Sequence, residues 1–353
     1  MSGTMSSSSA IPASDVVREL GAHPHRIRAL PVLVLFPHNR CNCRCVMCDI
    51  WRIRQGREIT ARDLEPHLES IRALGVRWVV FSGGEPQMHT DLPALSRALR
   101  AEGIRLTLLT AGLLLEPQAR SVADTIDDVI VSLDGPPEIH DRIRRVPGAF
   151  DRLARGVDAV RKLRPEMVVR GRSTVQKANY RYLRETAQSA KQIGLNSISF
   201  LAVDVTSRAF NRPDGWTPEA QSGVALNTEE VRELEAEVEA LIRERSQDLA
   251  TGYVVESVEK LRRIVRHFRA HLGQLAPVAP RCNAPWVSAV VEADGTVRPC
   301  FFHRALGNIR EKPLLAILNS EQALNFRERL DIASDPICRR CVCSLYLSPQ
   351  DVL

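Results

Sequence analysis

The sequence is poor in aromatic residues, which make up 5% of its 353 positions, and it contains no long apolar run. Its formal charge of +6 is spread among acidic residues, with no basic run interleaved with aromatic rings, so we expect no nucleic-acid partner. No stretch approaches the roughly 18 consecutive apolar residues of a membrane span, so we expect no membrane partner either.

Residues 1–14 lack the basic and apolar regions of a signal peptide. We therefore expect a cytoplasmic protein whose first residues form a disordered tail. No feature of the sequence indicates the oligomeric state.

Cysteine is absent from the whole middle of the chain, between residues 49 and 281. The nine cysteines form two groups instead, at positions 41–48 and 282–343. Because thiols stay reduced in the cytosol, this distribution favours metal ligation or redox chemistry over disulfide bonds.

In the first group, Cys41, Cys45 and Cys48 are spaced C-x3-C-x2-C. Three thiolates on one loop can converge on a single inorganic cluster and leave one metal position without a protein ligand, where a cofactor can bind. A disulfide framework, a zinc knuckle and an ordinary cysteine-rich loop are the alternatives. A structural zinc site needs four ligands, usually paired C-x2-C or histidine, so the spacing favours an iron–sulfur cluster.

Short apolar runs alternate with amphipathic segments after residue 30. The pattern predicts strands at residues 31–36, 76–81, 104–110, 128–133, 167–176 and 197–203, and helices at 61–74, 92–101, 117–123, 150–163 and 182–193. Repeated β–α units imply a parallel sheet with right-handed helical crossovers. Six strands are too few to close an eight-stranded barrel. The predicted fold is therefore α/β, a partial (β/α)6 TIM-like barrel, with a doubly wound open sheet as the alternative.

We expect four segments along the chain: an N-terminal extension, the barrel, a helical linker of two amphipathic helices, and a small α+β domain. Their predicted bounds are 1–30, 31–225, 226–280 and 281–353. In the last segment, the runs 288–292 and 296–300 flank an Asp-Gly turn at 294–295 and predict a β-hairpin, and a helix is predicted at 314–330.

Polar and glycine-rich motifs follow each of the first four predicted strands. After the cysteine loop come Ser82-Gly83-Gly84-Glu85-Pro86, then Thr110-Ala111-Gly112, then Ser132-Leu133-Asp134-Gly135-Pro136. Ligands of parallel α/β folds bind at the carboxyl ends of the strands, so we expect these groups to face one cavity.

The second cysteine group consists of Cys282, Cys300, Cys338, Cys341 and Cys343, which offer four ligands and one spare. Two separated pairs of cysteines also describe a zinc ribbon, so zinc is a more serious alternative here. We favour a second iron–sulfur cluster.

These motifs, together with Ile139-His140-Asp141-Arg142-Ile143-Arg144, resemble the radical S-adenosylmethionine (SAM) superfamily. The C-terminal spacing resembles the twitch domain, the short form of the SPASM domain: Cys282, twelve residues, Gly295, four residues, Cys300, then Cys338-x2-Cys341. The C-terminal segment would then be a twitch-type iron–sulfur domain of a β-hairpin plus helix.

The resemblance implies two clusters and one cofactor. Cys41, Cys45 and Cys48 would hold a [4Fe-4S] cluster whose fourth iron binds S-adenosylmethionine, and a flavodoxin or ferredoxin would be the electron donor. A second, auxiliary [4Fe-4S] cluster would be held by Cys282, Cys300, Cys338 and Cys341, with Cys343 as a possible substitute for Cys338. The implied contacts to S-adenosylmethionine are Gly83, Gly84, Glu85, Ser132, Asp134, Arg172 and Ser173.

The resemblance also implies reductive cleavage of S-adenosylmethionine to a 5′-deoxyadenosyl radical, which abstracts hydrogen from a small-molecule substrate. We expect a polar substrate such as a sugar, an aminocyclitol or another natural product. Dehydrogenation with the auxiliary cluster as electron acceptor is the leading hypothesis. Alternatives are epimerisation, peptide maturation, and a non-enzymatic iron–sulfur or zinc protein. A short N-terminus and too few C-terminal cysteines for a full SPASM set argue against peptide maturation.

Few residues can be assigned to the reaction itself. Cys43 and Cys300 are candidate hydrogen donors for epimerisation, although Cys43 fits better as a bystander within the motif. Arg170 is a further catalytic candidate. With Arg142, Arg144 and Arg145 it is also a candidate for an anionic pocket, although helix surfaces collect arginines for other reasons. Thr110-Ala111-Gly112 departs from the Thr-Asn-Gly frequent in the family, which places one contact near the adenosine in doubt.

Overall fold

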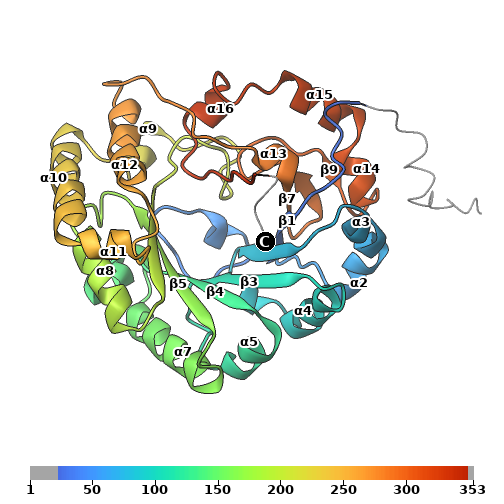
Figure 1. Cartoon of the computed structure of the whole chain (residues 1–353), viewed down its shortest axis with the longest axis horizontal. Coiled ribbons are helices and arrows are strands. Elements are labelled where there is room, and N and C mark those ends of the chain that lie inside the picture. Colours follow the sequence, from blue (N-terminus) through green and yellow to red (C-terminus); the bar gives the residue numbers. More distant parts are fainter. Residues whose placement is uncertain (1–22, 349–353) are drawn as a thin grey trace, which may run out of the picture.

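The protein is described by a computed structural model covering residues 23–348. The predicted disordered tail, residues 1–14, lies outside the described residues. Within them the strands form a single sheet in the order β6-β5-β4-β3-β2-β1-β7-β8-β9, which curves through the centre of the molecule (Figure 1).

The first six strands are parallel, and each lies beside the next one along the chain. They are β1 (Val32–His38), β2 (Trp78–Gly83), β3 (Arg105–Thr110), β4 (Asp128–Ser132), β5 (Val168–Val175) and β6 (Ser197–Ala202). Helices cover the outer side of the curve (Figure 1): α2 (Ala61–Leu64), α3 (Leu68–Ala73), α4 (Leu92–Ala101), α5 (Ala119–Thr125), α7 (Ala149–Leu163) and α8 (Leu183–Gln192). Because β6 lies at the edge of the sheet and does not pair with β1, the barrel is open, as predicted.

The C-terminal hairpin continues the same sheet. β7 (Ser288–Val291) pairs in parallel with β1, in the register Val32↔Ser288, and β8 (Thr296–Arg298) and β9 (Gly307–Asn308) follow in antiparallel order. The segment predicted as a separate small domain is thus hydrogen-bonded to the strand that leads into the first cysteine loop. This pairing brings the two distant cysteine groups to the same side of the molecule.

Three helices differ from the prediction. The helix expected at 61–74 is divided into α2 and α3 by the 3-10 turn η2 (Glu65–His67), which contains Pro66. The single helix expected at 314–330 is two helices, α14 (Leu314–Leu318) and α15 (Glu321–Arg329), because Ser320 caps the second one by accepting a bond from Ala323 N at 3.3 Å. The third difference is α6 (Pro137–Arg144), which no prediction covered. Its buried face includes His140 and Arg144, so it has no purely apolar stripe for periodicity to detect.

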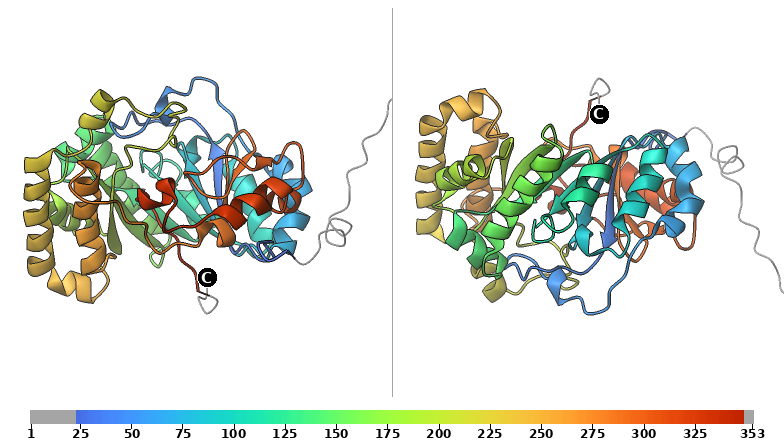
Figure 2. Two further views of the ribbon diagram at one scale, coloured as in Figure 1. Left: turned by 90° about the horizontal axis from the view of Figure 1, so that it is seen from above. Right: turned by 90° about the horizontal axis from the view of Figure 1, so that it is seen from below.

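The segment predicted as a helical linker packs on the β6 side of the sheet (Figure 2). Its long helices are α10 (Thr228–Glu244) and α12 (Val258–His271), and α10 begins with a capping box formed by Asn227 and Glu230. The chain between them bonds along the edge of β6: Ile198 N donates to Tyr253 O at 2.8 Å and Val255 N donates to Ile198 O at 3.0 Å. The open edge of the barrel is therefore covered.

The remaining elements are short. They are η1 (Ile50–Arg52), η2 (Glu65–His67), η3 (Pro86–Met88), α9 (Pro218–Ser222), α11 (Ser246–Ala250), α13 (Ala284–Val287) and α16 (Pro336–Arg339). Across residues 23–348, each helix is too short or too polar to pass through a lipid bilayer.

His267 on α12 makes the stability of this region dependent on pH. Burial lowers the pKa of its imidazole from 6.5 to about 4, and the ring lies 3.2 Å from the Val203 carbonyl at the end of β6. The neutral form is favoured in the folded state, so stability is full above pH 6.5 and falls as the pH drops towards 4.

We expect His267→Gln to remove about 2.5 kcal/mol of the stability difference between pH 7 and pH 4.5, since one pKa unit corresponds to about 1.4 kcal/mol and the interval covers most of the shift. Urea unfolding at pH 7 and pH 4.5 measures it. An unchanged difference between the two pH values would assign the acid sensitivity to other groups.

Candidate functional site

The first cysteine loop begins where β1 ends. Cys43 and Cys45 are buried, and Cys41 and Cys48 are half-buried beside them in one cluster of packed side chains. Ala111 and Ala149 belong to the same cluster, so the segment after β3 and the first residue of α7 also contact the cysteines. The three cysteines of the C-x3-C-x2-C spacing therefore face one small region, as predicted.

The end of α6 holds this loop in place from one side. Arg44 N donates to Arg144 O at 3.0 Å, and Val46 N donates to Ile143 O at 3.1 Å. These bonds explain the motif around His140 in physical terms, because it builds the helix that fixes the backbone between the cysteines.

The loop after β6 holds the cysteine loop from the other side. Asp49 N donates to Phe210 O at 3.2 Å, Trp216 Nε1 donates to the Asp49 carboxylate at 2.5 Å, and the buried Arg212 guanidinium donates to Met47 O at 2.5 Å. Arg212 also stacks on the Trp216 ring at 3.6 Å and pairs with Asp204 at 3.1 Å. Sequence analysis missed this clamp because its partners are more than 150 residues apart.

One buried guanidinium supplies positive charge to the cysteines. Arg144 Nη1 lies 3.5 Å from Cys45 Sγ, and Arg144 Nη2 lies 2.5 Å from Asp134 Oδ2. A hydrogen bond from Cys43, assisted by Arg144, lowers the pKa of Cys45 to about 6 against the effect of burial. Cys45 is thus prepared as a thiolate, the form that binds metal.

The other thiols of the loop hold their protons more tightly. Hydrogen bonds to Cys41 and Cys45 raise the pKa of Cys43, and burial raises the pKa of Cys48 to about 12. Metal binding at Cys48 must therefore displace a proton. Cys43 contacts both neighbouring thiols and does not line the cavity described below.

Gly83 and Gly84 allow the end of β2 to approach the cysteine loop closely. A Cβ on Gly84 would lie 2.1 Å from the Arg40 carbonyl oxygen, and one on Gly83 would lie 2.5 Å from Phe36. Glu85 N donates to that same Arg40 carbonyl at 2.7 Å. The glycines are thus required by the protein's own backbone, whether or not they also contact S-adenosylmethionine.

The Glu85 carboxylate is fully occupied within the protein. It accepts bonds from Thr110 Oγ1 and Ala111 N, both at 2.8 Å, and burial raises its pKa. It ties the end of β3 to the end of β2. Its contact with S-adenosylmethionine remains a prediction.

The other predicted polar contacts lie in different surroundings. Asp134 is buried, and its second oxygen accepts a bond from Thr174 N at 2.9 Å. Ser132 and Arg172 are half-buried, Ser173 is buried, and Arg172 Nε has no hydrogen-bond partner among the described residues. Of this set, the Arg172 guanidinium retains the most capacity to bind an anion.

The structure places Arg170 at the end of the sheet opposite the first cysteine loop. Its guanidinium pairs with Asp128 at 3.2 Å, at the start of β4 and so near the amino end of the sheet. The candidate anion site formed by Arg170 with Arg142, Arg144 and Arg145 is also not assembled, since Arg144 is committed to Asp134 and Cys45.

The C-terminal cysteines approach one another from three segments. Burial raises the pKa of Cys300 to about 11, with contributions from Cys282 and Cys343, and the pKa of Cys338 to about 12. Cys338 is buried whereas Cys343 is exposed. Burial nevertheless raises the pKa of the Cys343 thiol, as it does that of Cys338, so burial does not choose between the two as a ligand beside Cys341.

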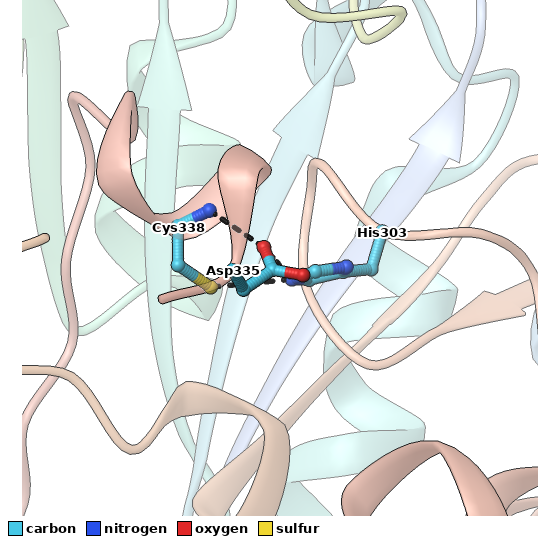
Figure 3. Close-up of side chains that lie close together, drawn as sticks. All are labelled: His303, Asp335 and Cys338. Atoms are coloured by element: carbon cyan, nitrogen blue, oxygen red, sulfur yellow. Dashed lines mark hydrogen bonds and ion pairs between the residues drawn. The ribbon is translucent and has the colours of Figure 1, made fainter. Parts of the chain in front are cut away.

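His303 was not predicted as part of this region. Its Nε2 lies 3.4 Å from Cys338 Sγ and 3.9 Å from Asp335 (Figure 3), and the Asp335 carboxylate caps α16 by accepting bonds from Ile337 N and Cys338 N. The available signal was the Cys-x2-His spacing from Cys300 to His303, which resembles a pair of metal ligands.

The arrangement of the thiols fits clusters better than single zinc ions. Zinc–sulfur bonds of about 2.3 Å place the ligand atoms of a tetrahedral site within about 4 Å of one another. Among residues 23–348, the one group of three or more such ligands within 4.8 Å is His303, Asp335 and Cys338, and it includes a single cysteine. The grouped cysteines of residues 23–348 thus do not form a closed set of zinc ligands.

A cavity of about 700 Å³ lies between the two cysteine regions. Ser82, Gly83 and Gly84 line it on the side of the first loop, and Cys341 lines it on the side of the second group. Its volume is typical of a site for a small organic molecule. Cys300 does not line it.

Two family models match the chain. The radical SAM superfamily model matches residues 35–190, and the SPASM model, an iron–sulfur cluster-binding domain, matches residues 282–342. The chain belongs to the radical SAM superfamily. This confirms the predicted family and its cofactors: a [4Fe-4S] cluster with S-adenosylmethionine, and auxiliary iron–sulfur binding in the C-terminal domain. Cys343 lies just outside the SPASM match, whereas the other four C-terminal cysteines lie inside it.

This radical SAM protein is similar to enzymes whose names refer to two different classes of molecule, a porphyrin and a peptide. Fe-coproporphyrin III synthase of Methanosarcina barkeri is 27% identical over 88% of this chain and 80% of its own length. PqqA peptide cyclase of Ruegeria pomeroyi is 26% identical over 86% of this chain and 77% of its own length. A crystal structure of Streptococcus suis SuiB bound to S-adenosylmethionine has a TM-score of 0.63 at 17% identity, covering 95% of this chain and 77% of SuiB, a likeness of fold.

Proposed function

We propose that this radical SAM enzyme oxidises a small molecule held in the cavity between its two cysteine regions, and that the auxiliary cluster accepts the second electron. The observation that carries the proposal is that one cavity is lined both by Gly83 and Gly84 and by Cys341. A molecule in it would lie between the site of hydrogen abstraction and an electron acceptor.

The cofactors supply the hydrogen-abstracting 5′-deoxyadenosyl radical, and the substrate must then lose one proton and one electron to complete a two-electron oxidation. Asp294 is suited to take the proton. It lines the cavity, and the other lining carboxylates are paired, Asp204 with Arg212 and Glu292 with Arg298. The clamp formed by Arg212 and Trp216 keeps the first cysteine loop rigid and helps exclude water from it.

The names of the relatives leave the substrate open between a porphyrin and a peptide. The sheet edges favour a small molecule. β9 has two residues, and the edge of β6 is covered by residues 253–255, so neither offers a strand along which a peptide could pair. For epimerisation, the thiols of Cys43 and Cys300 lie outside the cavity lining, so neither supports a role as hydrogen donor.

Cysteine variants test the two-cluster arrangement. Anaerobically reconstituted protein is expected to hold about eight irons per chain and to cleave S-adenosylmethionine to 5′-deoxyadenosine. Cys338→Ala is expected to hold about four irons and to retain cleavage, but to yield no two-electron oxidised product from the substrate. The measurements are iron content, 5′-deoxyadenosine and transfer of deuterium from labelled substrates.

Cys343→Ala is the matched control, since Cys343 lies just outside the SPASM match, and we expect it to keep about eight irons. Zinc in place of iron, or about four irons in the wild type, would contradict the two-cluster arrangement. Full product formation by Cys338→Ala would rule out electron transfer to the auxiliary cluster.

A further inference from the structure

Phenylalanine is scarce in this chain, yet it is concentrated in the cavity. Phe36, Phe210, Phe301 and Phe302 all line it, out of nine phenylalanines in the sequence. Their rings are neighbours in turn: Phe36 and Phe301 are stacked at 6.0 Å with 25° between their planes. Phe301 and Phe302 meet edge-to-face at 6.3 Å and 60°, and Phe210 and Phe302 at 6.4 Å and 70°. Such a lining favours a ligand with an apolar body.

The charged groups around these four rings are mainly positive. Two lining arginines are neutralised by carboxylates of the lining: Arg212 by Asp204, and Arg298 by Glu292. Four further arginines line the cavity from four different segments, and no ion pair with a described residue is formed by Arg57, Arg208, Arg304 or Arg340. Asp294 is the one lining carboxylate left to balance them among the described residues.

This combination argues against the polar substrates predicted from the sequence. Phenylalanine rings supply much of the apolar lining, which favours an apolar ligand body over a fully hydroxylated one. An aminocyclitol is cationic at neutral pH, and four unpaired guanidiniums would repel it. Guanidinium groups instead bind carboxylates through two parallel hydrogen bonds.

We propose that the substrate is a small organic polycarboxylate with an apolar body, packed against the four phenylalanine rings and held at its rim by Arg57, Arg208, Arg304 and Arg340. This inference rests on the proposed function, since it concerns the same cavity. It assigns the specificity of the enzyme to residues outside both cysteine regions.

Binding of a fluorescent probe tests the proposal. The probe is pyrene-1,3,6,8-tetracarboxylate, titrated with anaerobically reconstituted holoenzyme and followed by fluorescence anisotropy. We expect the double variant Arg304→Gln/Arg340→Gln to bind the probe about five- to tenfold more weakly, as two exposed charge pairs are lost. Phe302→Leu is expected to weaken binding about threefold through lost aromatic contact.

The matched control is Arg232→Gln/Arg243→Gln, which removes the same charge from the exposed face of α10. We expect it to bind like the wild type. Pyrene-1,3,6,8-tetrasulfonate separates carboxylate recognition from general anion binding, and we expect it to bind more weakly than the carboxylate. Equal loss in the two double variants, displacement of the probe by 2-deoxystreptamine, or tighter binding of an acidic peptide would each overturn the proposal.

The wild-type holoenzyme is assayed separately for cleavage of S-adenosylmethionine. If it cleaves the cofactor but binds the probe without dependence on Arg304 and Arg340, the substrate class is wrong and the proposed function stands. If it binds the probe as expected but does not cleave the cofactor, the proposed function is wrong instead.

Discussion

Replacing Arg144 by methionine is expected to lower the free energy of unfolding by about 3–5 kcal/mol. Arg144 is buried and pairs with the fully buried Asp134 at 2.5 Å, so its removal leaves a carboxylate without a countercharge inside the protein. Cys45 would also lose its donor at 3.5 Å. Urea unfolding of the cofactor-free protein measures the loss.

Two further variants separate this cause from others. Arg142→Met changes the same residue type on the exposed face of α6, and we expect a change within about 0.5 kcal/mol. The double variant Asp134→Asn/Arg144→Met removes both charges and should recover most of the loss. If the double variant is as unstable as Arg144→Met alone, the buried charge is not the cause.

Adding a methyl group at Gly84 is expected to have the second large effect. In Gly84→Ala the Cβ would lie 2.1 Å from the Arg40 carbonyl oxygen, a backbone atom that also accepts the bond from Glu85 N at 2.7 Å. The backbone before Cys41 would have to move and lose this bond. We expect a loss of about 3 kcal/mol in stability and poor loading of the first cluster, measured by urea unfolding and by iron content.

Gly56→Ala is the matched control because a Cβ at position 56 would also lie close to Arg40. Its Cβ would lie 3.2 Å from Arg40 Cδ, which belongs to a flexible side chain that can move aside. We expect stability and iron content close to those of the wild type. Normal iron loading in Gly84→Ala would mean that the cysteine loop tolerates a shift of the Arg40 backbone.

Much of the site could be predicted because cysteine is rare and its spacing is informative. The C-x3-C-x2-C loop, the glycines after β2 and the C-terminal cysteines were all found from the sequence, and the family comparison confirms the chemistry they imply. The residues that hold these groups were not found. Arg212 and Trp216 carry no local signal that separates them from ordinary arginines and core aromatics, and His303 was marked only by its Cys-x2-His spacing from Cys300.

Two of the polar residues predicted to bind a ligand have partners within the protein. Asp134, predicted to contact the cofactor, pairs with Arg144, which was itself a candidate for an anionic pocket. The sequence places these two residues ten positions apart, on either side of a helix that was not predicted. Only the turn of α6 brings their side chains together and buries them.

The sequence by itself determined the barrel strands, the two cysteine groups and the radical SAM chemistry, since apolar periodicity and ligand spacing are local properties. The tertiary structure decided where the cavity proposed to hold the substrate lies. β7 pairs with β1, and this single non-local pairing brings Cys341 to the cavity lined by Gly83. The same pairing brings Phe36, on β1, beside Phe301, which follows β8, because side chains distant in sequence become neighbours when the backbone hydrogen bonds of a sheet align them.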